Sequence, residues 1–206
     1  MEPRWFDWAS RIQAIAQNGL AFSRNPYDIE RFQALRLIAA EILADGSDAG
    51  IRRIEGLFEQ ETGYATPKID VRGAVFRGNS LLFVRESLDG LWTLPGGFAD
   101  IGDSPSSSVE REIAEESGFE ARAVKLIAVI DRRQDPHCPP HPFHIWKLIF
   151  LCEITGGQPK TSLETTGVEF FGENELPPLS LGRTSPRQLD LVFKHHSDPS
   201  RPADFD

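Results

Sequence analysis

The chain has 206 residues, of which 40% are hydrophobic and 26% are charged, and its formal net charge is -9. These values predict one ordinary folded domain with a small addition, or two small domains, and they exclude the fibrous and disordered classes of protein. An acidic chain does not attract nucleic acid or anionic membranes. We therefore expect neither extended nucleic acid nor a membrane as a partner.

The two cysteines, Cys138 and Cys152, have no spacing that suggests a disulfide framework. The N-terminal segment lacks the apolar core of a signal peptide, and no apolar run is long enough to cross a membrane. We therefore expect a cytoplasmic protein.

Residues 1–64 are expected to form a helical N-terminal domain. Apolar residues recur at three- and four-residue spacing over residues 5–16, and Asn18-Gly19 predicts the end of this first helix. A second helix is predicted to begin with Asn25 as its N-cap, and a third, short helix covers residues 51–58.

These three helices carry no residues that suggest chemistry, so we interpret them as a packing or dimerisation module. Their apolar faces offer more surface than three short helices can bury among themselves. They must therefore cover either the rest of the chain or a second subunit, and we expect a homodimer. Trp5 and Trp8, like Trp146 further along the chain, are predicted to be core or dimer contacts.

Residues 65–206 are expected to form a second domain built around a sheet. Residues 69–87 predict a hairpin of two short strands joined by Gly78-Asn79-Ser80. The proline-rich segment 131–144 predicts an irregular loop, and residues 197–206 predict a mobile terminus. Residue type and spacing predict three further strands and one helix, at 124–130, 145–154 and 168–171 for the strands and near 186–196 for the helix.

Between these strands lies a helix with three glutamates on one side. Ser104 as the N-cap, followed by a proline, and Gly118 as the C-terminal glycine predict a helix over residues 105–117. Glu112, Glu115 and Glu116 then stand at i, i+3 and i+4, so we expect all three carboxylates to point the same way.

Like charges at this spacing repel one another and destabilise an isolated helix. One alternative is a solvated acidic face that is relieved by Arg111, four residues before Glu115. The glycine pair of LPGG, residues 94–97, leads into the helix and favours a second alternative. In it, the converging carboxylate oxygens bind a hard divalent cation such as Mg²⁺, which balances the repulsion.

The surrounding pattern resembles the Nudix box. That box is Gly, five residues, Glu, seven residues, Arg-Glu, an apolar residue, any residue, Glu-Glu, any residue, Gly and an apolar residue. Here Gly97, Asp103 and the segment 111–119, REIAEESGF, match eight of the nine defined positions, and Asp103 is the departure. The resemblance implies a hydrolase that uses Mg²⁺ or Mn²⁺ and cleaves the pyrophosphate bond of a nucleoside diphosphate linked to another moiety. It also implies an α/β/α sandwich with a mixed sheet.

The resemblance implies a role for each matching residue. Glu112 and Glu116 correspond to the principal metal ligands, and Glu115 to a further ligand or an acid that orients the ligands. The backbone carbonyl of Gly97, or of the glycine before it, can supply one more oxygen ligand. Arg111 corresponds to the residue that braces the glutamates, and the shorter carboxylate at Asp103 is expected to weaken that brace.

The likeness extends from Trp5 to Leu191 and looks like the Nudix subgroup with a helical N-terminal domain. This subgroup includes bacterial CDP-choline pyrophosphatases, so the first expectation is hydrolysis of CDP-choline to CMP and phosphocholine. The alternative is an ADP-ribose or nucleoside-diphosphate-sugar pyrophosphatase.

Four residues outside the box are candidates for the substrate pocket. Arg72 and Arg85, on the two hairpin strands, suit forked contacts with phosphate oxygens, although either could instead form a surface salt bridge. Trp92 could edge the cleft. By analogy with the family, Glu164 in a late loop is the candidate general base, but it could equally be an exposed loop acid.

The proline-rich loop carries a cluster of His and Cys residues. Their order fits no reliable zinc-site spacing, and we prefer a rigid wall to a metal site for His137, Cys138, His141 and His144. Two rival functions remain, a nucleotide-binding regulator without turnover and an enzyme acting on RNA ends. The three intact box glutamates argue against the first, and the net charge of -9 argues against extended RNA binding.

Overall fold

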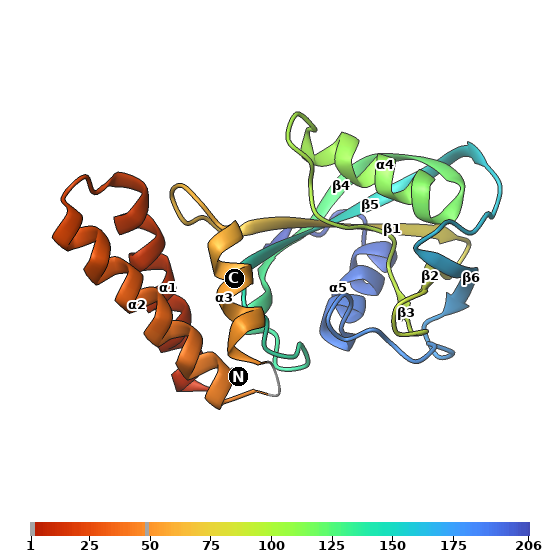
Figure 1. Ribbon diagram of the computed structural model, residues 1–206. Coiled ribbons are helices and arrows are strands. Elements are labelled where there is room, and N and C mark those ends of the chain that lie inside the picture. Colours follow the sequence, from red (N-terminus) through yellow and green to blue (C-terminus); the bar gives the residue numbers. More distant parts are fainter. Residues whose placement is uncertain (1–2, 48–49) are drawn as a thin grey trace. The chain divides into compact units, whose positions relative to one another are not determined.

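The computed structural model describes residues 3–47 and 50–206 (Figure 1). The chain forms two compact units, which we describe separately. One comprises the chain up to Pro67 together with Pro140–Phe143, and the other comprises Lys68–Pro139 and His144–Asp206. Among the described residues, no helix is both long and apolar enough to cross a membrane.

The first unit is helical, as predicted, with α1 (Arg4–Phe22), α2 (Pro26–Asp45) and α3 (Ile51–Gln60). Asn25 caps α2 by accepting a hydrogen bond from the Tyr27 amide, at 2.9 Å. The core of the unit is formed where the three helices meet, by Phe6, Ala9, Ala39, Ala40, Leu43, Ile54 and Phe58.

The predicted end of α1 at Asn18-Gly19 is wrong, because the helix continues to Phe22. Gly19 serves close packing instead: a Cβ at this position would lie 2.3 Å from the ring of Phe32 on α2. Asn18 accepts a hydrogen bond from the Ala65 amide, at 2.7 Å. Both residues therefore make tertiary contacts, and their sequence only looks like the end of a helix.

The second unit is the predicted mixed sheet with a helix on each face. Its strands lie in the order β3-β2-β1-β5-β4-β7, and β6 pairs with β2. β1 is parallel to β5 and antiparallel to β2, so the sheet is mixed. The elements are β1 (Lys68–Arg77), β2 (Ser80–Glu86), β3 (Trp92–Thr93), α4 (Pro105–Ser117), β4 (Phe119–Asp131), the 3₁₀ turn η1 (Arg132–Gln134), β5 (Ile145–Gly157), β6 (Thr165–Gly172), α5 (Pro186–Ser197) and β7 (Asp204–Phe205).

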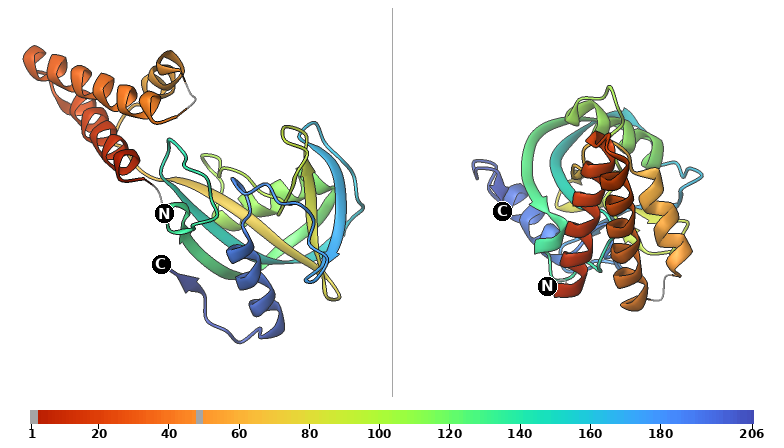
Figure 2. Two further views of the ribbon diagram at one scale, coloured as in Figure 1. Left: turned by 90° about the horizontal axis from the view of Figure 1, so that it is seen from below. Right: turned by 60° about the vertical axis from the view of Figure 1, so that its left-hand side comes forward.

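Alternation along β1 builds two cores, one on each face of the sheet. Val71 and Val75 pack with Ile113 of α4, whereas the intervening Ala74 packs with Leu189 of α5. Figures 1 and 2 show α4 and α5 on opposite faces of the strands. The predicted α/β/α sandwich is therefore confirmed.

The C-terminal segment is not the mobile terminus that its composition predicts. β7 pairs in parallel with β4 at the edge of the sheet, with Ala128 opposite Asp204. The Asp204 carboxylate lies 2.8 Å from Nε2 of the buried His195 and 3.0 Å from both Nε and Nη2 of Arg201. These side-chain contacts hold the segment, and they are not visible in its Pro- and Asp-rich composition.

Two helical glycines provide a test of the packing in the first unit. Alanine is a better helix former than glycine by about 1 kcal/mol. Gly56→Ala on α3 should therefore raise the thermal unfolding midpoint, because nothing lies within 4 Å of the added Cβ. Gly19→Ala should lower it, because the new methyl group displaces the Phe32 ring. An equal rise in both variants would contradict the close contact of α1 with α2.

Candidate active site

The helix that carries the three glutamates begins and ends where the sequence predicts. Ser104 accepts a hydrogen bond from the Ser107 amide, at 3.1 Å, and Pro105 is the first helical residue. Gly118 ends the helix in the left-handed conformation, with φ 75°. A Cβ on Gly118 would lie 2.5 Å from the Gln158 carbonyl oxygen, so a side chain would displace that backbone. These constraints fix the position of α4 along the sheet.

The three glutamates of α4 have different surroundings, although they were expected to point the same way. The Glu116 residue is buried, with 6% of its surface exposed, and its Oε2 accepts a hydrogen bond from the Gly96 amide, at 2.9 Å. The Glu112 side chain is 12% exposed, and the Glu115 side chain is 60% exposed. Glu116 and Glu112 therefore face the loop before α4, while Glu115 is largely solvated.

Arg111 joins the acids on the outer side of the site. Its guanidinium lies 2.9 Å from Glu115 Oε2, 3.0 Å from Glu112 Oε1 and 3.2 Å from Asp103 Oδ2. Asp100 adds a further contact at 3.1 Å. The shorter carboxylate at Asp103 therefore still reaches the arginine, and the brace expected from the box pattern is present.

The loop between β3 and α4 lies against β1. The Gly73 amide donates to the Pro95 carbonyl and the Val71 amide to the Gly97 carbonyl, both at 2.8 Å. Gly96 has φ 142°, and a Cβ there would lie 2.0 Å from the Val71 carbonyl oxygen. Only glycine fits this close approach, which brings the Gly96 amide to Glu116.

Burial and crowding make the inner carboxylates electrostatically unfavourable. Burial, with the added charges of Glu86 and Glu112, raises the pKa of Glu116 to about 7, against the opposing effects of Arg72 and the Gly96 amide. Burial likewise raises the pKa of Glu112 and of Glu86 above their ordinary values. Near neutral pH, the neighbouring positive charges therefore do not balance the negative charge of these acids.

The donor chemistry of this group fits a hard divalent cation. Within the described ranges, no three His, Cys, Asp or Glu side chains form a cluster that could hold a metal ion. Mg²⁺, however, usually takes only one or two protein carboxylates and completes its shell with waters and phosphate oxygens. Glu112 and Glu116 supply carboxylates of that kind. The Gly97 carbonyl already accepts the Val71 amide, and a carbonyl oxygen has a second lone pair.

Glu164 lies in the loop before β6, beside the inner acids. Its backbone carbonyl accepts a hydrogen bond from the Ser87 amide, at 2.8 Å, and the hydroxyl of the next residue, Thr165, donates to the Glu116 carbonyl, also at 2.8 Å. The charge of Glu164 contributes to the raised pKa of Glu86, after burial of that group. The exposed Glu164 side chain thus belongs to the same group of acids.

The other predicted pocket residues are placed differently. Arg72 is 3% exposed and forms a forked ion pair with Asp70, at 2.8 and 2.9 Å, so it is neither a surface salt bridge nor a free phosphate ligand. Arg85 is exposed, and its Nε donates to the Gly90 carbonyl at 2.8 Å. Trp92 is half-buried, with its ring 5.0 Å from that of Phe171.

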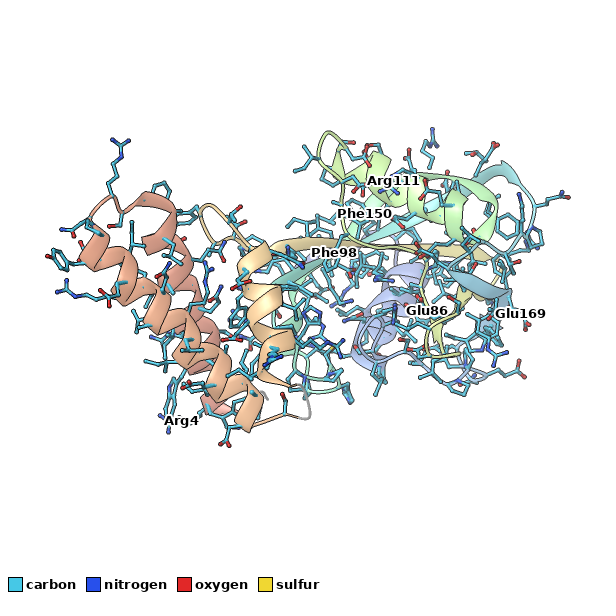
Figure 3. The ribbon with its side chains drawn as sticks, in the orientation of Figure 1. Arg4, Glu86, Phe98, Arg111, Phe150 and Glu169 are labelled. Carbon is cyan, nitrogen blue, oxygen red and sulfur yellow. The ribbon has the colours of Figure 1, made fainter. Side chains whose placement is uncertain are left out.

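Two residues of the site, Glu86 and Arg183, were not predicted from the sequence. Glu86 lies at the end of β2 (Figure 3) and is buried. Its Oε1 forms an ion pair with Arg183 Nε, at 2.9 Å. The alternation of side chains along β2 could have indicated Glu86. Four buried apolar residues are followed by Arg85 and Glu86, and neighbouring residues of a strand point to opposite faces, so one of these two side chains must point inward. The suitability of arginine for phosphate contacts favoured Arg85, but that side chain points outward.

Two histidines of the proline-rich loop contact separate acids. His137 Nδ1 lies 3.2 Å from Asp135, and His144 Nε2 lies 3.1 Å from Asp131. The absence of a metal-binding cluster among the described residues includes this loop. The preference for a rigid wall over a zinc site stays a prediction.

Substitution of one glutamate at a time tests the inner site. Glu116→Gln should abolish most of the rise in thermal unfolding midpoint that Mn²⁺ produces, because it removes the buried charge. Glu115→Gln, the matched control on the solvated side of the same helix, should retain most of that rise. The fold should survive in both variants, since neither side chain belongs to a hydrophobic core. Equal responses to Mn²⁺ in the two variants would contradict the division into inner and outer glutamates.

Comparisons with known proteins agree with this geometry. The family described as "UDP-X-like, N-terminal oligomerisation domain" matches residues 3–58, and the family described as "NUDIX domain" matches residues 66–192. A Bacillus subtilis protein named provisionally as an ADP-ribose pyrophosphatase, YjhB, is 47% identical over 100% of this chain and 99% of its own length.

Two solved structures are also similar. A Streptococcus suis ADP-ribose pyrophosphatase is 35% identical and has a TM-score of 0.63. The match covers 68% of this chain and 100% of the Streptococcus suis chain. A UDP-X diphosphatase is 31% identical, has a TM-score of 0.65, and matches over 98% of both chains.

Proposed function

Because the chain belongs to the Nudix hydrolase family and is a pyrophosphohydrolase, we propose that it hydrolyses ADP-ribose to AMP and ribose 5-phosphate. The observation that carries this proposal is the 47% identity, over the whole chain, to the Bacillus subtilis protein named for that substrate. The similarity to the Streptococcus suis enzyme supports it. CDP-choline, the first expectation from the sequence, appears in none of these names, so ADP-ribose takes its place.

In the reaction, the oxygen of water forms a bond to one phosphorus, and that phosphorus loses its bond to the bridging oxygen, which leaves with the other phosphate. A bound divalent cation, when present, neutralises charge on the phosphates and lowers the pKa of the attacking water. Glu112 and Glu116 are the residues that would hold it. Arg111 positions Glu112 through the contact at 3.0 Å, and the Gly96 amide positions Glu116.

Glu164 is the proposed general base. Two hydrogen bonds hold its loop. The Ser87 amide donates to the Glu164 carbonyl, and the Thr165 hydroxyl donates to the Glu116 carbonyl. The carboxylate is exposed, so water can reach it and give up a proton to it. Arg72, fully buried beside Asp70, positions the inner acids through its charge and does not touch the substrate.

A UDP-linked sugar or related nucleoside diphosphate is the second candidate. The UDP-X diphosphatase matches nearly the full length of both chains, including the helical unit. The non-enzymatic alternative, a nucleotide-binding regulator, is disfavoured because the three box glutamates and their arginine brace are all in place.

A substrate panel tests the proposal. With Mg²⁺, we expect ADP-ribose to give the highest kcat/KM among ADP-ribose, UDP-sugars and CDP-choline, with AMP and ribose 5-phosphate as the only products by anion-exchange chromatography. EDTA should abolish turnover, and added Mg²⁺ should restore it. UMP or CMP as the preferred product would replace ADP-ribose with the corresponding substrate, and no turnover of any compound would favour the regulator.

We also propose that the helical unit makes the protein a homodimer. The domain it matches is described as an oligomerisation domain. On α1, Trp8, Ile15 and Phe22 are exposed at seven-residue spacing, on the side opposite the buried Phe6 and Ala9. An exposed apolar row of this kind suits contact with a second copy.

Light scattering tests the dimer. Ile15→Glu places a charge in the middle of the exposed row and should shift the protein from dimer to monomer at micromolar concentration. Glu41→Lys, a change on the exposed surface of α2, is the control and should leave the mass unchanged. A monomeric wild type, or a dimeric Ile15→Glu variant, would contradict this surface.

A further inference from the structure

The candidate active site carries an excess of negative charge, and its proposed metal ligands, which are acids themselves, add to that charge. Glu86, Glu112, Glu116 and Glu164 are grouped around one region, and a pyrophosphate brings more negative charge to it. A cation supplied by the chain would have to be near these acids, accessible to solvent, and able to offer nitrogen atoms that are not already bonded.

Most nearby cations fail one of these conditions. Arg72 is buried, and its Nε and Nη2 bind Asp70 while its Nη1 binds the Leu94 carbonyl, at 3.1 Å. Arg111 is surrounded by acids. Arg85 is exposed on the face of β2 opposite the buried Glu86, with its Nε on the Gly90 carbonyl, so it points away from the acids. Lys147 is buried and donates to the Arg183 carbonyl.

Arg183 meets all three conditions: it is near the acids, it is accessible to solvent, and one of its nitrogens is not bonded. Its side chain is 31% exposed, and its Nε forms the 2.9 Å ion pair with Glu86. Its Nη1 lies 3.2 Å from Ser180 Oγ and 3.6 Å from Asp89 Oδ2. Across residues 3–47 and 50–206, the structure shows no hydrogen-bond partner for Nη2. Two of the guanidinium nitrogens, Nε and Nη1, are thus held by Glu86, Ser180 and Asp89, and Nη2 is open.

The backbone of Arg183 is fixed to the same framework as the inner glutamates. Its amide donates to the Ser180 carbonyl, at 2.8 Å, and its carbonyl accepts the buried Lys147 ammonium. The next residue, Thr184, accepts a hydrogen bond from the Leu94 amide, at 3.1 Å. Leu94 is two residues before Gly96, whose amide binds Glu116. A short, rigid path therefore connects Arg183 to the metal-binding side of the site.

We propose that Arg183 binds a non-bridging oxygen of the substrate's pyrophosphate through its open Nη2, while Glu86 holds its Nε. The proposal rests on the proposed function only in requiring a pyrophosphate substrate, because the contact is independent of the base and of the leaving group. Arg183 is thus a substrate-binding residue, and Glu86 is the residue that positions it.

Binding of inorganic pyrophosphate tests the contact without turnover of a nucleotide. In saturating Mg²⁺, calorimetry should show that Arg183→Gln weakens pyrophosphate binding by roughly tenfold to a hundredfold, the range expected for a hydrogen bond to a charged group. Arg183→Lys keeps the charge but has a single nitrogen to share between Glu86 and the phosphate, so its affinity should fall between the two.

A matched control separates this effect from a general change of charge. Arg187→Gln removes the same charge from the first turn of α5, where the arginine contacts the Gln134 carbonyl and Asp206, and it should bind pyrophosphate within about twofold of the wild type. Wild-type affinity in Arg183→Gln would overturn the proposal. If Arg183→Gln does not fold, Arg183→Lys decides: it keeps the ion pair with Glu86, and wild-type affinity in that variant assigns Arg183 a structural role only.

The outcome for Arg183 is distinguishable from the outcome for the proposed function. A wild type that prefers a UDP-sugar to ADP-ribose removes the substrate assignment but leaves the pyrophosphate result valid. Conversely, ADP-ribose turnover with unchanged KM in Arg183→Gln and Arg183→Lys supports the substrate assignment and overturns the role of Arg183.

Discussion

The site depends on the burial of one carboxylate, that of Glu116, between α4 and the glycine loop. Its hydrogen bond from the Gly96 amide requires a backbone so close to β1 that no side chain fits at Gly96. Burial and the neighbouring acids then raise the pKa of Glu116 to about 7. A carboxylate in this position is unfavourable for the chain alone and favourable in the presence of a divalent cation. Burial, more than repulsion among the glutamates of α4, therefore makes Glu116 a candidate ligand for a cation.

The fold holds this carboxylate by placing three separate segments around it. The loop before α4 lies along β1, the loop before β6 contacts Glu116 through Thr165, and the turn before α5 contacts Leu94 through Thr184. The last two segments also bring charged side chains, those of Glu164 and Arg183, and β1 itself carries Arg72. The sandwich therefore positions residues that are distant in sequence on one rigid framework, as a phosphoryl-transfer site requires.

The sequence was most informative where local rules and function coincide. The caps at Ser104 and Gly118 predicted the bounds of α4 because they follow from the geometry of a single helix. The metal-binding role of its glutamates was implied by the resemblance to the Nudix box and stays a prediction. Glu86 was missed because its importance comes from strand parity and from the distant Arg183. Gly19 was misread because its reason is the ring of Phe32 on another helix. The preference for CDP-choline was not supported either, since the base and leaving group are recognised by loops whose shapes the box motif does not specify.

The most direct test of the buried metal site is the location of bound metal in solution. Substoichiometric Mn²⁺, added to isotopically labelled protein, broadens the amide NMR signals of nearby residues. We predict selective broadening at Gly96, Gly97 and the residues around Ser87 and Glu164, with little effect in the loop of His137 and His144. Selective broadening in that histidine loop, or no selective broadening anywhere, would contradict the assignment of the buried glutamates as the metal site.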